Sequence, residues 1–365
     1  CDFNSHVRDQ IDYEDWREVL IADLRWESRT AKPEKLQSIF FGGGTPSLMP
    51  PSLVYSLVNE AEKLWGFEPG IEITLEANPS SVEVAKFLDL ASVGINRISL
   101  GVQSFMDHHL KFLGRVHSSL EAKTALDIAQ RNFERVSIDL IYALPDQTPE
   151  NWFNELTQAV ANGTEHLSLY QLTIEQNTRF ATDVRRGLFQ PMEEDLATEL
   201  YTMTDEIMTQ AGLPAYEISN HSRPGCASAH NLAYWRYNDY HGVGPGAHGR
   251  IANYALQRHK KPENFVSAVR KYSNGLKERK RLKPTEMICE ALLMGLRLTE
   301  GLDLKSLEGR MGFSQKEIVN EAKIKFLEDL GLVSLNQSTL SVTNKGRPVL
   351  DGIIAEVVND GLHLT

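Results

Sequence analysis

Three consecutive glycines, residues 42–44, directly follow an apolar run at residues 36–41 and precede Thr45. Glycine has no side chain, so the backbone N–H groups of such a loop can lie directly against a polar ligand. A plain tight turn would use the same residues, so the loop alone does not identify a site. No Lys-Ser or Lys-Thr pair follows, and the glycines are contiguous, which excludes a P-loop and a dinucleotide-binding fingerprint.

Polar side chains also lie at the ends of later apolar runs. Glu76 and Gln103 each close an apolar run, and Asp139 lies within a third run at residues 136–141. If these runs are strands of a parallel barrel, their carboxyl ends meet at one edge and the three side chains converge beside the glycine loop. Two carboxylates and an amide there predict a pocket for a polar ligand that carries hydroxyls and an amine or a carboxylate. Each residue alone could instead cap a helix or stabilise a turn.

The elements that must position these residues alternate regularly between residue 14 and about residue 220. Strands are expected at Leu36–Phe41, Ile71–Glu76, Arg97–Gly101, Val136–Ile141, Leu167–Leu172 and Ala215–Ile218. Helices are expected at Tyr13–Ser28, Pro51–Trp65, Ser81–Ser92, Leu120–Asn132, Pro149–Asn162 and Met192–Ala211. Alternating strands and helices predict a parallel sheet with crossover helices. Six short repeats favour an α/β fold with a partial (β/α)6 barrel of the TIM type.

A different pattern begins near residue 282. Its expected elements are three helices, a hairpin and a last helix, at Pro284–Arg297, Leu304–Met311, Gln315–Leu330, Leu332–Leu335 with Leu340–Thr343, and Gly352–Val358. This order predicts a small winged-helix-like α+β domain at residues 282–365. Such domains often bind DNA, but this region has nine Lys or Arg against twelve Asp or Glu, and the whole chain has a net charge of −11. We therefore expect no nucleic-acid partner and favour a lid or docking role for this domain.

The composition bounds the class of protein. With 41% hydrophobic and 24% charged residues, the chain is globular, and no apolar run is long enough for an integral membrane segment. Cys1, Cys226 and Cys289 are too far apart in sequence to indicate a shared metal site or a disulfide framework, so a reducing, cytoplasmic location is expected. Because the chain opens on Cys1 rather than Met, we expect that further residues, and any targeting signal, precede it.

Six motifs, met in order along the chain, resemble those of the radical S-adenosylmethionine proteins related to oxygen-independent coproporphyrinogen III oxidase. They are Cys-Asp-Phe-Asn-Ser-His from residue 1, Gly-Gly-Gly-Thr-Pro-Ser from residue 42, Glu-Ala-Asn-Pro from residue 76, Gly-Ile-Asn-Arg-Ile-Ser-Leu-Gly-Val-Gln-Ser-Phe from residue 94, Asp-Leu-Ile-Tyr-Ala-Leu-Pro from residue 139, and His-Leu-Ser-Leu-Tyr-Gln-Leu-Thr from residue 166. The resemblance extends into the C-terminal region.

In that family a Cys-x-x-x-Cys-x-x-Cys loop binds three irons of a [4Fe–4S] cluster, and the fourth iron binds the amine and carboxylate of S-adenosylmethionine. The resemblance makes Cys1 the third cluster ligand and places the first strand, the cluster loop and the other two cysteines before residue 1. One thiolate cannot hold four irons, so we expect no intact cluster on this chain alone. The cofactor-binding residues that the resemblance implies are Gly43, Gly44, Thr45, Glu76, Gln103, Arg115, Asp139, Thr173 and His248.

A second constellation lies at residues 230–235, His-Asn-Leu-Ala-Tyr-Trp. The neutral imidazole of His230 would make a good axial ligand to heme iron, and the rings of Tyr234 and Trp235 suit a flat porphyrin face. A buried aromatic turn with a hydrogen-bonded histidine would explain the same spacing. The His-Asn-x-x-Tyr-Trp pattern resembles the segment associated with heme in the heme-chaperone branch of the family.

The second residue after the third cluster cysteine separates the two branches of the family. The true oxidases resemble Cys-x-x-x-Cys-x-x-Cys-x-Cys, and Phe3 stands here at the position of the extra cysteine. The sequence therefore predicts a cytoplasmic heme chaperone that passes heme to apoproteins, with cleavage of S-adenosylmethionine left open. The alternatives are oxidative decarboxylation of coproporphyrinogen III to protoporphyrinogen IX and a winged-helix regulator. We expect a barrel at residues 1–220, an aromatic and histidine-rich segment completing its side at 221–281, and the C-terminal domain at 282–365.

Overall fold

The structure is a computed structural model that describes residues 11–31, 34–176 and 178–358. The chain divides into two compact units, which are described separately below. Unit 1 takes in the residues up to 17, residues 34–215 and residues 219–228. Unit 2 takes in residues 18–33, residues 216–218 and the chain from residue 229 onward.

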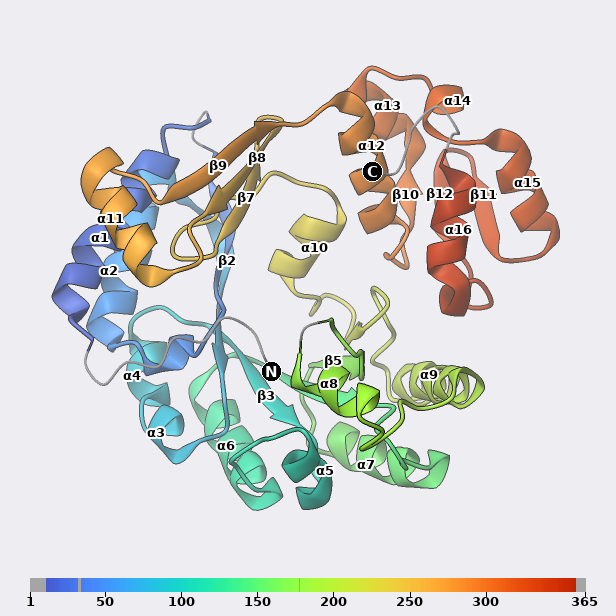
Figure 1. Ribbon diagram of the computed structural model, residues 1–365, viewed down its shortest axis with the longest axis horizontal. Helices are drawn as coiled ribbons and strands as arrows, with labels where there is room; N and C mark the ends of the chain where they lie inside the picture. The colour runs from blue at the N-terminus through green and yellow to red at the C-terminus, as the bar shows by residue number, and fades with distance from the viewer. Residues whose placement is uncertain (1–10, 32–33, 177, 359–365) are drawn as a thin grey trace. The chain divides into compact units, whose positions relative to one another are not determined.

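Unit 1 is built on one six-stranded sheet whose spatial order follows the order of the strands along the chain. The strands are β1 (Leu36–Phe41), β2 (Phe67–Ala77), β3 (Arg97–Gln103), β4 (Arg135–Tyr142), β5 (His166–Gln171) and β6 (Asn220–Ser222). Strands β1 to β5 are parallel, and the sheet curls into a half-barrel with helices along its outer side (Figure 1). The prediction of an α/β partial barrel is confirmed.

The sixth strand differs from the one expected at Ala215–Ile218. Ala215 makes only an isolated antiparallel bridge with His221, so the chain reverses direction between these two residues. The returning arm, β6, then pairs antiparallel with β5. The expectation was wrong because an apolar run does not show in which direction a strand will run. Where the chain reverses tightly, it also does not show which of the two segments will pair with the sheet.

The helices of unit 1 connect successive strands. They are α2 (Pro51–Trp65), α3 (Ser81–Val84), α4 (Phe87–Ser92), α5 (Asp107–Phe112), α6 (Ser119–Asn132), α7 (Pro149–Ala161), α8 (Arg179–Arg185) and α9 (Glu194–Gln210), with a 3-10 turn at Pro46–Leu48. The helix expected at Ser81–Ser92 is divided into α3 and α4, and the short helices α5 and α8 were not expected. Local capping explains some of the starts: Ser118 and Glu121 form a capping box on α6.

Buried strand residues and inward-facing helix residues form the core of unit 1. Leu75 of β2, Leu100 of β3 and Ile138 of β4 are fully buried, and Phe87 of α4 and Trp152 of α7 belong to the same fully buried core. Parallel strands covered on both faces are continuous apolar runs rather than alternating ones. This property made the strands recognisable in the sequence.

Unit 2 combines part of α1 (Tyr13–Glu27) with α10 (Ala229–Trp235), α11 (Pro262–Tyr272) and a three-stranded antiparallel sheet. The strands of this sheet are β7 (His248–Ile251), β8 (Tyr254–Arg258) and β9 (Leu276–Arg281). Ala252 and Asn253 form the turn between β7 and β8 with φ angles of 49° and 67°. Left-handed conformations at both turn residues match the twist of the hairpin strands.

A buried ion cluster joins α1 to β8 within unit 2. Arg258 donates from Nε to Asp23 Oδ2 at 2.8 Å and from Nη2 to Glu27. Asp23 also accepts the N–H of Gly275, and Glu27 Oε1 lies 3.0 Å from Nδ1 of His241. The side chains of Asp23, Glu27 and Arg258 have no exposed surface. Buried charges persist only when they are paired and hydrogen-bonded, so this cluster fixes α1 against the small sheet.

The C-terminal part of unit 2 contains the expected helices and hairpin. Its elements are α12 (Pro284–Gly295), β10 (Leu302–Asp303), α13 (Leu304–Met311), α14 (Gln315–Ile318), α15 (Glu321–Asp329), β11 (Val333–Asn336), β12 (Thr339–Val342), a 3-10 turn at Arg347–Val349, and α16 (Leu350–Val357). The strands form a sheet in the order β10–β12–β11. The helix expected at Gln315–Leu330 is divided because Asn320 caps a new helix, α15, by accepting the N–H of Lys323.

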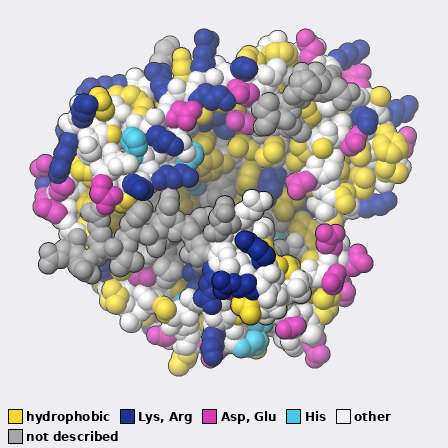
Figure 2. Space-filling model, in the orientation of Figure 1, with side chains coloured by type: hydrophobic (Ala, Val, Ile, Leu, Met, Phe, Trp, Pro, Cys, Tyr) yellow, Lys and Arg dark blue, Asp and Glu magenta, His cyan; other side chains and the backbone are white. Residues whose placement is uncertain are grey.

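Charged side chains of both signs are interspersed over the face of the molecule shown in Figure 2. Apolar side chains gather over the C-terminal elements in this view, and Phe326 of α15 is 58% exposed. Within the described ranges, no helix is sufficiently long and apolar to cross a membrane.

Candidate functional site

The glycine loop directly follows β1. Gly43 and Gly44 have φ angles of 80° and 60°, and an added Cβ at either residue would meet no atom within 4 Å. Their backbone therefore faces open space in a conformation that other residues rarely adopt. Gly42 is required for a different reason, because a Cβ there would lie 2.8 Å from the ring of Phe40 and 3.3 Å from the carboxylate of Glu76. Thr45 ends the loop and precedes the 3-10 turn.

Glu76 lies at the carboxyl end of β2 and is bonded to the loop. Its Oε2 accepts the N–H of Gly43 at 3.0 Å. Burial raises the pKa of Glu76, and the nearby charge of Asp139 raises it further, while the Gly43 hydrogen bond lowers it. The carboxylate therefore lies in an environment that opposes its own ionisation.

Asp139 lies on β4, opposite Ser168 of β5. The hydroxyl of Ser99 on β3 lies 3.2 and 3.3 Å from the two carboxylate oxygens. Burial raises the pKa of Asp139, although hydrogen bonds from Ser168 and Ser99 and the charges of Arg97 and Arg115 lower it. Asp139 thus connects three neighbouring strands at this part of the sheet.

Arg115 is brought to the same place by the turn after α5. Gly114 has a φ of 71°, and the N–H of Arg115 bonds to the carbonyl of Leu110 at 2.8 Å. Burial lowers the pKa of Arg115, and the charge of Asp139 raises it. The Nε atom of Arg115 is buried and has no hydrogen-bond partner among the described residues. We call Gly43, Glu76, Arg115 and Asp139 the rim cluster.

Gln103 ends β3 in an irregular conformation. Its φ is 68°, and the register of β3 against β4 shifts between Leu100 and Gln103. A Cβ on Gly101 would lie 2.9 Å from Nε2 of Gln103 and 3.6 Å from the carbonyl oxygen of Ala77 at the end of β2. The irregularity folds the Gln103 amide back over Gly101, as bulges next to functional sites commonly do.

The other expected cofactor residues are Thr173, in unit 1, and His248. Thr173 is exposed two residues beyond β5, and its hydroxyl lies 3.4 Å from the carbonyl of Gln171. His248 belongs to unit 2, where it begins β7 and its Nε2 lies 3.4 Å from the Gln257 amide. Cys1 and Phe3 lie outside the described residues.

Sequence reasoning missed Arg97, Ser99 and Ser168, which surround Asp139. Arg97 is only 3% exposed, and its charge acts on Asp139 from the neighbouring strand β3. A signal was available, since Arg97 is a charged residue at the start of an otherwise apolar run. Ser99 and Ser168 gave none, because serine in a buried strand is common and only the strand register aligns these two with Asp139.

The expected heme motif forms the short helix α10 in unit 2. His230 and Tyr234 are one helical turn apart, with ring centroids at 4.7 Å in an edge-to-face arrangement. Tyr234 in turn contacts Tyr240 at 4.4 Å, and burial raises the pKa of Tyr234 to about 12. The guanidinium of Arg297 lies 4.7 Å above the Trp235 ring. The motif thus presents a histidine beside aromatic rings that contact one another edge to face.

Two family models match this chain. The radical SAM superfamily model covers residues 1–157, and the HemN C-terminal domain model covers residues 282–349. Heme chaperone HemW from Haemophilus influenzae is 34% identical over 97% of this chain and 92% of its own length. Radical S-adenosyl methionine domain-containing protein 1, mitochondrial, from Bos taurus is 32% identical over 98% of this chain and 84% of its own length.

The solved structure of coproporphyrinogen III oxidase (HemN) from Escherichia coli has a TM-score of 0.80 over 97% of this chain and 85% of that chain, at 21% identity. This likeness confirms the fold. Fold and sequence together define a radical SAM protein. Within that class, the chain belongs to the HemN-like proteins of the HemW branch. Membership of the superfamily implies a [4Fe–4S] cluster and S-adenosylmethionine as cofactors.

The rim cluster is chemically compatible with S-adenosylmethionine. Its carboxylates suit an amine and ribose hydroxyls, and the guanidinium of Arg115, with its unpartnered Nε, suits a carboxylate. The open space in front of Gly43 and Gly44 leaves their backbone accessible to a ligand. Among the described residues, no group of three or more His, Cys, Asp or Glu side chains forms a metal site.

Proposed function

We propose that this protein is a heme chaperone, which binds heme and passes it to apoproteins that require it. The observation that carries the proposal is the arrangement of α10, where His230 and Tyr234 lie ring against ring. The naming of full-length relatives as heme chaperones supports it. The bovine relative is named mitochondrial, so a cytoplasmic location stays a prediction.

In the proposed heme site, His230 is the axial ligand and the rings of Tyr234 and Trp235 flank the porphyrin. A histidine ligates iron through a neutral ring nitrogen. Arg297, stacked on Trp235, fixes the indole in place. Edge-to-face contact with Tyr234 restricts the rotation of the His230 ring, which lowers the entropy cost of ligation.

In the proposed cofactor site, the rim cluster binds S-adenosylmethionine. Glu76 binds its amine, Arg115 its carboxylate, and Asp139 with Gln103 the ribose hydroxyls, while the loop residues Gly43, Gly44 and Thr45 line the methionine end. Thr173 and His248 are further cofactor contacts, and Cys1 is the third cluster ligand. When bound, the cluster and S-adenosylmethionine supply one-electron chemistry. The residues of this chain orient the cofactor and exclude water around it.

Replacement of His230 tests the heme proposal. In the full-length protein, reconstituted anaerobically, His230→Ala should abolish or strongly shift the heme absorption bands, because the axial ligand is lost. Iron content and S-adenosylmethionine binding should not change, since they depend on other residues. His259→Ala, which removes another histidine of unit 2, is the matched control. Unchanged heme spectra and stoichiometry in His230→Ala would refute the ligand assignment.

Decarboxylation of coproporphyrinogen III is the alternative activity. The likeness to the Escherichia coli oxidase shows a shared fold, which does not by itself carry an activity. The unmutated full-length protein should therefore be incubated with coproporphyrinogen III, S-adenosylmethionine and a reductant without oxygen. Formation of protoporphyrinogen IX would replace the chaperone proposal with the oxidase.

A further inference from the structure

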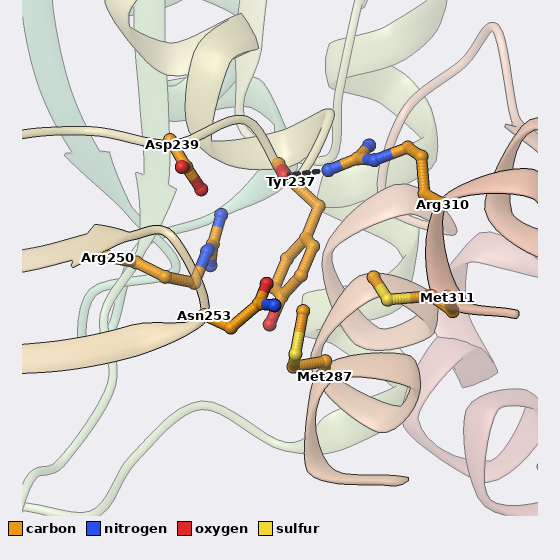
Figure 3. A pocket seen from close by; sticks show the side chains of 7 residues that line it. All are labelled: Tyr237, Asp239, Arg250, Asn253, Met287, Arg310 and Met311. Carbon is orange, nitrogen blue, oxygen red and sulfur yellow. Dashed lines mark hydrogen bonds between the residues drawn. The ribbon is translucent and has the colours of Figure 1, made fainter. Parts of the chain in front are cut away.

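Unit 2 contains a small cavity beside the heme motif. It has a volume of about 60 Å³ and lies against the turn after α10, the β7–β8 turn, α12 and α13. The side chains around it are Tyr237, Asp239, Arg250, Asn253, Met287, Arg310 and Met311 (Figure 3). A single water occupies roughly 10–15 Å³ in this measure, so the cavity admits a group of several heavy atoms.

Two guanidinium groups approach the cavity, extending toward Tyr237 from opposite sides (Figure 3). Arg250 is 4% exposed, lies 3.5 Å from the centroid of the Tyr237 ring, and has an Nε without a hydrogen-bond partner among the described residues. Arg310 donates to the backbone carbonyls of Tyr237 and Arg236, at 2.7 and 3.4 Å. Within the described part of the chain, no carboxylate lies within ion-pair distance of Arg310.

The two carboxylates nearby already have partners. Asp239 accepts the N–H of Ala252 at 2.8 Å, and Glu290 accepts the hydroxyl of Tyr237 at 2.6 Å. Glu290 is 3.9 Å from Nη1 of Arg250, and Nη2 of Arg250 donates to the carbonyl of Asn238 at 2.8 Å, which leaves Nε without a partner among the described residues. Among the described residues, Arg250 and Arg310 therefore have more N–H donors than the hydrogen-bond acceptors around them use.

The arginine and methionine side chains around the cavity favour a ligand group that is both anionic and partly apolar. Guanidinium donors bind planar oxyanions, and a carboxylate fits their fork geometry. The thioether side chains of Met287 and Met311 supply apolar surface beside them. A carboxylate on a short alkyl arm satisfies both features.

The cavity is linked to the heme motif by consecutive ring contacts. The His230 ring contacts Tyr234 at 4.7 Å, Tyr234 contacts Tyr240 at 4.4 Å, and the Arg250 guanidinium lies 5.4 Å from the Tyr240 ring. A porphyrin bound through His230 carries two propionates at its edge. We infer that this cavity receives one heme propionate, bound by Arg250 and Arg310, an inference that rests on the proposed heme-binding function.

Esterified heme separates this inference from the function on which it rests. The full-length protein is titrated with heme and with heme dimethyl ester, which lacks both carboxylates. Arg310→Met should weaken heme binding about ten- to a hundred-fold, because a charge-assisted contact is lost. It should leave binding of the ester and the position of the heme absorption band unchanged. Arg279→Met, an exposed arginine on β9, is the matched control and should bind both ligands normally.

The possible results distinguish a failure of the propionate inference from a failure of the proposed heme-binding function. Equal weakening of heme and ester in Arg310→Met, or no weakening of either, would overturn the propionate assignment alone. Failure of the unmutated protein to bind heme would overturn the proposed function and this inference with it. Arg250→Met should show the same selective loss, but it removes a buried stacking partner of Tyr237, so Arg310 provides the decisive variant.

Discussion

The pKa values of Glu76 and Asp139 are both raised in the folded protein. The charge of Asp139 adds to the rise at Glu76, whereas the charges of Arg97 and Arg115 oppose the rise at Asp139. Burial is the main cause of both upward shifts. An acid whose folded pKa is raised binds more protons in the folded state, so its contribution to stability falls as pH rises above the unfolded pKa, about 3.9 for Asp. At neutral pH burial therefore opposes the ionised forms of Glu76 and Asp139, and an ammonium group bound beside them would favour ionisation.

Asp139→Asn should raise the stability of the protein and lower its affinity for S-adenosylmethionine. Without bound cofactor, the variant should melt at a higher temperature than the unmutated protein at pH 8, and the difference should vanish near pH 3, where Asp139 is protonated. Its affinity for S-adenosylmethionine should fall roughly ten- to a hundred-fold, the cost of one charge-assisted hydrogen bond. Iron content should hardly change. Calorimetry across pH and cofactor titration measure both effects.

The control for Asp139→Asn is Asp127→Asn, an exposed carboxylate on α6. It should change neither the melting temperature nor the cofactor affinity appreciably. A lower melting temperature for Asp139→Asn at pH 8 would show that the hydrogen bonds to Ser99 and Ser168 outweigh the desolvation of the carboxylate.

At the scale of elements, the α1–β8 ion cluster governs the stability of unit 2. Arg258→Met should lower its free energy of unfolding by about 3–5 kcal/mol, because two buried carboxylates lose their counter-charge. Arg279→Met on the exposed strand β9 should cost far less. Urea unfolding followed by fluorescence measures both. A loss below about 1 kcal/mol in Arg258→Met would mean that water reaches Asp23 and Glu27.

The α1–β8 ion cluster also makes the stability of unit 2 depend on pH. Burial would raise the pKa of Glu27, but hydrogen bonds from His241 and Arg258 and the charge of Arg258 lower it below 4.5. A carboxylate with a lowered folded pKa stabilises the protein above its unfolded pKa and loses that contribution as pH falls through the folded value. Unit 2 should therefore lose stability below about pH 4.5, and in Arg258→Met this slope should weaken.

The sequence predicts some elements of this fold and not others. The strands β2 to β5 were recognisable because their buried stretches are rich in apolar residues. The strand β1 was recognisable from its apolar residues before the glycine loop, although none of them is buried. The small β7–β9 sheet was not expected, because β9 is almost entirely charged and exposed. Glu76 and Asp139 could be selected as polar residues in apolar strands. The effect of the Asp139 charge on Glu76, and the hydrogen bonding of Ser99 to Asp139, depend on strand register, which the sequence does not show.

At the scale of the whole molecule, the C-terminal elements share a core with the segment before them. Tyr237 is 2% exposed and belongs to the same buried cluster as Ile288 and Leu292 of α12. Deletion of residues 282–365 should therefore unfold the rest of unit 2. Protease should then cleave within residues 229–281, while unit 1 resists. A chain ending at residue 358 is the control, and protease resistance of residues 229–281 in the longer deletion would contradict this prediction.

The partners in the α1–β8 ion cluster lie far apart along the chain, and this separation affects the order in which the protein folds during synthesis. In unit 1 each of the strands β2 to β5 pairs with the strand synthesised just before it, so the sheet can grow as the chain leaves the ribosome. Asp23 and Glu27 are made early, yet their partner Arg258 lies 235 and 231 residues further on. Until that arginine emerges, these two carboxylates must stay hydrated. We therefore expect α1 to dock against β8 late, after unit 1 has folded.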